Sequence, residues 1–221
     1  MIDRSQVEQK DNRVKVAIKP EFGWRQYNNG YLTLWLKGWI SGENGESILR
    51  RFADAESQID ASLFGKFLAG VCGHFALVLQ GPRFTLAAVD CVRSIPLTLA
   101  PKGEDWVIDD QGDRLRRAVG FSRKDVDMNA ACAIAMAGYT IDNLSLYRGL
   151  QVMAPGELFF IVAEKAPVKQ RYYKYRPWQI EERDINTNRI ALAERTLKIM
   201  DRTISSLDGR PLIIPLSAGN D

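Results

Sequence analysis

Short apolar segments joined by tight turns recur through the first 175 residues, and this feature most constrains the fold. Residues 74–80 and 83–89 flank Gly81-Pro82, and Asn29-Gly30 precedes 31–36 with two residues that tolerate positive φ. Strands connected by such short turns pair antiparallel. We therefore expect an α+β body built on antiparallel sheets. Its other strands are predicted at 14–19, 95–100, 105–109, 157–163 and 168–175.

Residues 31–36 place apolar side chains on both faces of a strand, which predicts a sheet covered on both sides. The apolar spacing in 46–69 predicts one or two amphipathic helices. Residues 127–137 predict another helix, with Asp127 as its N-cap and Gly138 at its end. Two sheets stacked face to face, with helices outside, accommodate these elements.

The pattern changes after residue 178. Residues 187–207 repeat apolar positions at alternating spacings of three and four, which predicts a long helix. The run LIIPL at 212–216 is typical of a strand buried on both faces, as in a parallel sheet. We therefore expect two parts, 1–178 and 179–221, and we expect the second to be incomplete and to pack poorly.

Composition narrows the function classes. Apolar residues make up 46% and charged residues 26%, which excludes intrinsic disorder. The net charge of +3 indicates no polyanionic partner, so we expect no nucleic acid. No uncharged run is long enough to cross a membrane. Three scattered cysteines and one histidine predict neither a disulfide framework nor a metal site, and a cytoplasmic location fits best.

The end of the chain resembles a nucleotide loop. Leu216-Ser217-Ala218-Gly219-Asn220-Asp221 is similar to the ATP-pyrophosphatase loop of the asparagine synthetase family, with Ala218 in place of a glycine. The resemblance implies nucleotide binding by Leu216, Ser217, Gly219 and Asp221, with ATP and Mg²⁺ as cofactors of a full-length protein. For residues 1–221 alone we expect negligible ATP binding.

The body resembles the other half of that family, a glutaminase-type domain of the N-terminal nucleophile hydrolase fold. Gly73-His74-Phe75-Ala76-Leu77 is similar to a family strand, and the Pro155-Gly156 turn to the one before its last hairpin. Residues 90–97 resemble an Asp-x-x-Gly-x-x-Pro-Leu segment, with Ser94 near the expected glycine. The resemblance implies an αββα sandwich, followed by the first helix and strand of a truncated α/β ATP-pyrophosphatase domain.

The sequence departs from this family where glutamine chemistry would occur. The family's nucleophile is a cysteine after the initiator methionine, and this chain has Ile2 there. The glutamine-binding Asn-Gly-Glu segment falls on Lys37-Gly38-Trp39, where only Gly38 matches. A family aspartate falls near Asn44. We therefore expect a degenerate glutamine site with no catalytic residue.

Other reactive residues have structural interpretations. Cys72-Gly73-His74 could be a nucleophile and base, but a buried cysteine beside a lone histidine is favoured, and Cys91 and Cys132 are expected in the core. Asp109-Asp110 and Asp125/Asp127 could be acid–base or metal pairs; a polar loop beginning at Asp110 and a helix cap at Asp127 are favoured. Residues 169–176 mix basic and aromatic side chains, as single-strand nucleic-acid surfaces do, and a solvated strand face is favoured.

The favoured function is the N-terminal part of an asparagine synthetase-like, ATP-dependent amide-forming ligase or amidotransferase with an inactive glutaminase half. Its partners would be the missing C-terminal synthetase domain and a small-molecule carboxylate. Two alternatives stay open: a non-catalytic domain that packs on a synthetase, and a β-lactam-synthetase-like ligase that uses a substrate amine. The sequence also leaves open whether the protein is a homodimer.

Overall fold

The computed structural model describes residues 13–53, 60–162, 165–176, 178, 184–207 and 209–214. It divides into two compact units, Met1–Tyr175 and Arg176–Asp221. The predicted boundary lies at 178/179, and the identities given to the two parts stay predictions. No helix of the described residues is long and apolar enough to cross a membrane.

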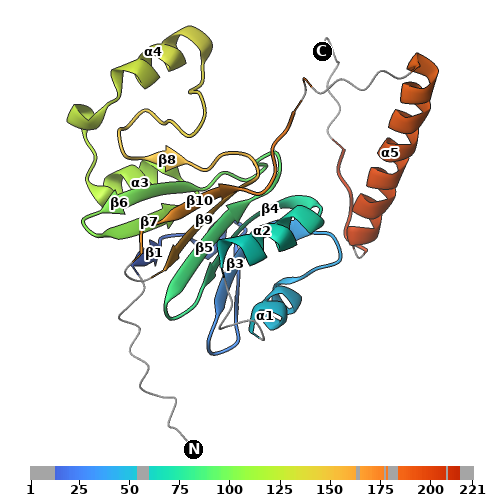
Figure 1. Cartoon of the computed structure of the whole chain (residues 1–221), viewed down its shortest axis with the longest axis horizontal. Coiled ribbons are helices and arrows are strands. Elements are labelled where there is room, and N and C mark those ends of the chain that lie inside the picture. Colours follow the sequence, from blue (N-terminus) through green and yellow to red (C-terminus); the bar gives the residue numbers. More distant parts are fainter. Residues whose placement is uncertain are drawn as a thin grey trace, which may run out of the picture. The chain divides into compact units, whose positions relative to one another are not determined.

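Ten strands of the first unit form two sheets (Figure 1). The six-stranded sheet has the order β10-β9-β5-β4-β3-β2, with every pair antiparallel. Its strands are β2 (Arg25–Asn28), β3 (Thr33–Ile40), β4 (Gly73–Gln80), β5 (Phe84–Val89), β9 (Glu157–Val162) and β10 (Val168–Arg171).

The four-stranded sheet has the order β1-β7-β6-β8, and β1 runs parallel to β7 while the other pairs are antiparallel. Its strands are β1 (Val14–Val16), β6 (Thr98–Lys102), β7 (Asp105–Asp109) and β8 (Gln151–Val152). The helices of this unit are α1 (Gly45–Ala53), α2 (Ala61–Gly70), α3 (Gly112–Val119) and α4 (Met128–Ala137), with short 3-10 turns at Pro20–Phe22 and Arg123–Asp125.

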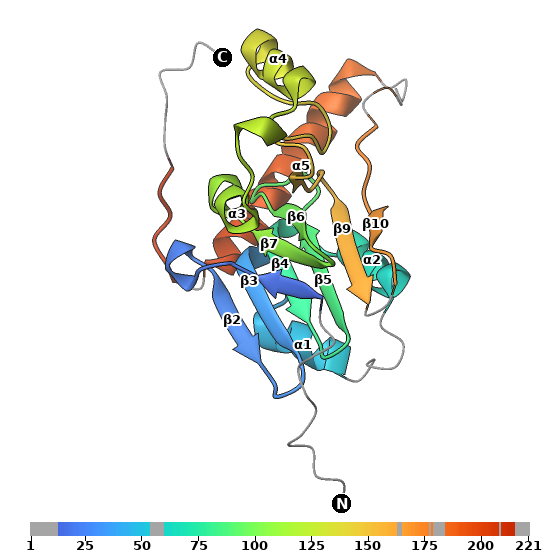
Figure 2. The same cartoon turned by 90° about the vertical axis from the view of Figure 1, so that its left-hand side faces the viewer.

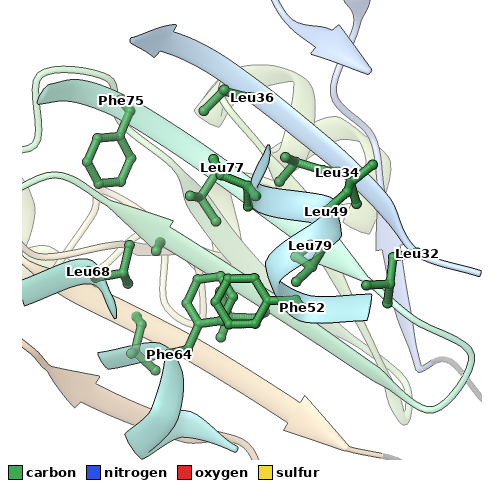
Figure 3. Close-up of a cluster of buried hydrophobic side chains, with 14 of the residues drawn as sticks. Leu32, Leu34, Leu36, Leu49, Phe52, Phe64, Leu68, Phe75, Leu77 and Leu79 are labelled. Atoms are coloured by element: carbon green, nitrogen blue, oxygen red, sulfur yellow. The ribbon is translucent and has the colours of Figure 1, made fainter. Parts of the chain in front are cut away.

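Three hydrophobic clusters show how the layers stack. The first joins α1 and α2 to one face of the six-stranded sheet, and Figure 3 shows Phe52 lying over Phe64, with ring centroids 4.3 Å apart. The second lies between the sheets, where Val78 and Phe159 meet Ile108. The third joins Leu115 of α3 to the outer face of the four-stranded sheet.

The first unit is therefore a helix–sheet–sheet–helix sandwich, and Figure 2 shows α1 and α2 on the opposite side of the six-stranded sheet from β6 and β7. The predicted mixed α+β class with two mainly antiparallel sheets is confirmed. Several strand bounds differ from the prediction: β1 ends at Val16, β3 spans Thr33–Ile40, β6 begins at Thr98 and β10 ends at Arg171.

The helix predicted at 187–207 is present as α5 (Ile185–Ser206), with Asp184 as its N-cap. The strand predicted at 212–216 is wrong for its described residues, since 212–214 form no strand and expose at least 49% of each side chain. Residues 215 and 216 lie outside the described residues. A strand needs a paired neighbour for its backbone N–H and C=O groups, and the described residues of the second unit include no strand that could be one.

Candidate functional site

Gly38 is the described residue for which the sequence predicts a degenerate glutamine-binding position, and that role stays a prediction. It lies on β3 opposite Phe75 of β4. Its φ is +87°, and a Cβ there would lie 1.9 Å from the backbone oxygen of His74. Only glycine satisfies both the backbone angle and this approach. The glycine is therefore required by the strand pairing itself.

Lys37, the preceding residue, connects the two sheets at this point. The β3 alternation places Leu36 in the cluster under the helices and directs Lys37 to the face that meets the four-stranded sheet. Its Nζ lies 3.3 Å from Asp110 Oδ2, directly after β7. The indole Nε1 of Trp24 donates to the same oxygen at 2.9 Å. Asp110 is thus held by residues from separate parts of the fold.

Asp109 and Arg114 complete this charged cluster. The Arg114 Nε donates to Asp109 Oδ2 at 2.6 Å, and its Nη2 donates to Asp109 Oδ1 and, at 2.9 Å, to Asp110 Oδ1. The Gln111 N–H donates to Asp109 Oδ1 at 3.0 Å. Every carboxylate oxygen of the pair accepts a hydrogen bond from the protein.

The pKa values of Asp109 and Asp110 shift in opposite directions because the surroundings of the two carboxyls differ. Burial raises the pKa of Asp109 above its ordinary value, against the hydrogen bonds from Arg114. Burial also opposes ionisation of Asp110, but hydrogen bonds from Trp24 and Lys37 outweigh it and lower that pKa. Split pKa values are typical of acid–base pairs. Here each charge is neutralised by a fixed cation, so the arrangement fits a structural ion-pair network.

A loop does begin at Asp110, as the sequence predicts, but it is short because α3 begins at Gly112. Asp110 is 8% exposed and Asp109 is fully buried. The predicted structural role of Asp127 is confirmed, since its side chain accepts from the N–H groups of Asn129 and Ala130. Asp125 forms a capping box with Ser122.

Trp39 stands at the position where the sequence resemblance predicts a glutamate. Its ring lies edge-on to that of His74, with centroids 5.7 Å apart. His74 Nδ1 lies 2.7 Å from Ser94 Oγ. An indole carries no negative charge, so Trp39 cannot pair with a cation as a glutamate would.

The turn at residues 90–95 is hydrogen-bonded to His74 and Phe75 of β4. The buried carboxylate of Asp90 accepts from the N–H groups of Phe75, Val92 and Ser94. The positive φ of the turn falls on Arg93, at +57°, rather than on Ser94. The Asp-x-x-Gly spacing counted from Asp90 would have found this residue.

Asn44 stands near the expected family aspartate, and its side chain is used locally. Its Oδ1 accepts from Ser47 N–H at 2.8 Å, and Ser47 Oγ accepts from Asn44 N–H at 2.9 Å. These bonds satisfy free backbone donors at the start of α1. The residue therefore serves as a helix cap.

The cysteines contradict the expectation of core positions. Cys72 and Cys132 are exposed and Cys91 is half-buried, and His74 is exposed as well. Burial and the neighbouring Asp90 raise the pKa of the Cys91 thiol, which lowers its nucleophilic thiolate fraction. Within the described ranges, no three His, Cys, Asp or Glu residues lie where they could hold a metal ion.

The predicted nucleotide-binding residues Leu216, Ser217, Gly219 and Asp221 lie outside the described residues, as does Ile2. Among the residues that the structure describes, Gly38 and Trp39 follow Lys37 on β3, and Lys37 joins this strand to the charged cluster through Asp110. Sequence reasoning singled out Asp109 and Asp110 but missed their partners Lys37, Trp24 and Arg114. A lysine between Trp35 and Trp39 on one strand face was the available signal.

Comparisons with known proteins find distant likeness only. No protein-family model matches the sequence, and no curated protein matches it. Among solved structures, the chain is similar to the glutamine phosphoribosylpyrophosphate amidotransferase from B. subtilis complexed with ADP and GMP, at 14% identity and a TM-score of 0.35. It is also similar to a structure described as the allosteric regulatory enzyme of purine biosynthesis, at 15% identity and a TM-score of 0.35. Each match covers 69% of this chain but 31% of the other, and likeness this distant does not assign a function.

Proposed function

We propose that the chain is the N-terminal part of an asparagine synthetase-like, ATP-dependent amide-forming ligase, and that its glutaminase-type half does not hydrolyse glutamine. The proposal rests on the sequence resemblance and on the sandwich of residues 13–175. In this proposal the nitrogen comes from ammonia or a substrate amine. The protein would act in the cytoplasm on a small-molecule carboxylate.

The proposal is carried by residues 37–39, the segment where the resemblance places the glutamine site. The side chains of this segment are already engaged in contacts within the protein. Lys37 is ion-paired to Asp110, and Trp39 packs against His74. A glutamine placed beside Gly38 would bring its ammonium toward a cation and an indole. A buried, unpaired ammonium is strongly unfavourable, so these residues oppose glutamine binding.

Glutamine turnover tests the inactive half. The purified 221-residue protein, incubated with glutamine, should release no glutamate above a heat-denatured sample, and diazo-norleucine should label no cysteine. Mass spectrometry of the intact protein reads out the labelling, with an active glutaminase as the positive control. Glutamine turnover together with labelling of Cys72, Cys91 or Cys132 would contradict the proposal.

Pyrophosphate release tests the ligase half. In the full-length gene product, ATP and Mg²⁺ would be used to activate the carboxylate, and an amine would displace AMP. Asp221→Ala should abolish carboxylate-dependent pyrophosphate release if Asp221 belongs to the nucleotide loop. Asp201→Ala, at an exposed position of α5, is the matched control and should retain it. Equal pyrophosphate release by both variants would show that Asp221 is not part of the nucleotide site.

A further inference from the structure

The segment between residues 128 and 144 exposes an unusual amount of apolar surface. Residues 128–141 contain no charged side chain. Of the helix α4 inside this segment, only Ala130 is buried. Six large apolar side chains are exposed by 38–88%: Met128, Ile134, Met136, Tyr139, Ile141 and Leu144.

The two ends of this segment are joined to each other, and Tyr147 packs against the cluster on the outer face of the four-stranded sheet. Val126 pairs with Tyr147 in an antiparallel bridge, and Asp127 N–H donates to Leu146 O at 2.9 Å. Arg148 N–H donates to Asp125 O at 2.8 Å. Figures 1 and 2 both show α4 standing clear of the two sheets. The segment therefore projects from the sandwich, and the described residues of its own unit do not cover its exposed apolar side chains.

The size of this surface matches one half of a protein–protein interface. At about 150–200 Å² for each side chain, the six residues expose together about 600 Å². A standard interface removes about 800 Å² from each partner, and weaker ones remove less. The largest apolar patch of a typical monomer covers about 300–600 Å² and often has a function, so the summed area here lies at the upper end of that range.

The composition of α4 favours another copy of itself as the occupant. A two-fold dimer requires one patch that is complementary to itself. A patch with no unpaired charge meets this condition. The one charged residue between 128 and 144 is Asp142, and it is ion-paired with Arg171 at 2.9 Å. The alanines at 131, 133, 135 and 137, which are not buried, also allow two helices to approach closely.

We propose that residues 128–144 form the contact surface of a homodimer, with α4 packing against α4 of a second copy. This inference is independent of the proposed ligase function.

Sedimentation of the 221-residue protein from about 1 to about 100 µM tests this proposal. We expect a concentration-dependent monomer–dimer equilibrium. Met136→Glu and Ile141→Glu should each raise the dimer dissociation constant at least about 30-fold, because each would bury a charge. Val92→Glu is the matched control, since Val92 is 67% exposed outside this segment, and it should leave the constant unchanged.

A second measurement locates the interface. With Cys72 and Cys91 changed to serine, a spin label on the exposed Cys132 of α4 should give a short inter-label distance in the dimer. Circular dichroism would verify that each glutamate variant is folded. A monomer over the whole concentration range, or a dimer that both glutamate variants leave intact, overturns the proposal.

Discussion

At Gly38, backbone angle and neighbouring strand both exclude a side chain. We predict that Gly38→Ala lowers the free energy of unfolding by about 3 kcal/mol or more, because a methyl group would collide with the His74 carbonyl and hold φ in a strained region. Urea denaturation measures this loss. Gly70→Ala is the control, since a methyl carbon added there would have no other atom within 4 Å, and it should change stability little. Equal stability of the two variants would contradict this account of β3 and β4.

The Asp110 carboxylate carries a second prediction at this scale. Asp110→Asn should cost about 2 kcal/mol at neutral pH, because Lys37 and Arg114 lose part of their compensating charge. Asp105→Asn, at the exposed start of β7, is the control and should change stability by less than about 0.5 kcal/mol. Urea denaturation of both variants measures the two costs.

The pKa of Asp110 fixes the pH dependence of that difference. Its folded pKa lies below the ordinary value of 3.8, so the charged group contributes its full stability above that value. The contribution is lost as the pH falls through the folded pKa. The difference between wild type and Asp110→Asn should therefore be largest near about pH 6 and shrink below about pH 4. A difference that grows on acidification would mean that the carboxyl is destabilising when charged.

Residue-level roles were predictable only where the signal is local. The cap at Asp127 follows from its place before an apolar helix. The left-handed conformation of Arg93 was missed because the glycine of the Asp-x-x-Gly pattern was placed near Ser94 and not three residues after Asp90. The Arg93 Nη1 donates to Met153 O at 3.2 Å and helps hold the turn. Lys37, the partner of Asp110, lies 73 residues away on another sheet, and no periodicity reports such a pair.

At the scale of elements, α4 depends on its cap more than a packed helix does. Only one of its residues is buried, so tertiary packing contributes little to it. We predict that Asp127→Ala costs about 1 kcal/mol and speeds hydrogen exchange at the amides of Asn129 and Ala130. Asn129→Ala, in the same turn, is the control. Unchanged exchange in Asp127→Ala would show that another group satisfies these donors.

Helices and hairpin strands were predictable because their periodicity is contained in the segment itself. The α5 pattern of apolar positions predicted the helix correctly, although no residue of α5 is buried. The strand prediction failed at 212–214 because an apolar composition permits a strand but does not supply a neighbouring strand to pair with. Strand formation depends on pairing, which lies outside the segment.

At the scale of the whole molecule, the layering follows from strands with two apolar faces. In β3, Leu34 and Leu36 pack under the helices while Trp35 packs against the cluster between the sheets. This two-sided pattern was readable in the sequence and required a second sheet or helix layer on each side. The parallel pairing of β1 with β7 was not readable, because it joins segments about 90 residues apart.

The distribution of the core predicts that the first unit folds without the second. Among the described residues, all buried members of the three hydrophobic clusters lie between Val14 and Ile161, within the first unit. A chain ending at Tyr175 should therefore keep the urea midpoint and the m-value of the 221-residue protein, since m follows the surface exposed on unfolding. A chain ending at Pro167 is the matched control. It loses β10 and the bond of 2.6 Å from Tyr172 Oη to Val89 O, so its midpoint should fall. If both shortened chains lost the transition, residues 176–221 would have to complete the core of the sandwich.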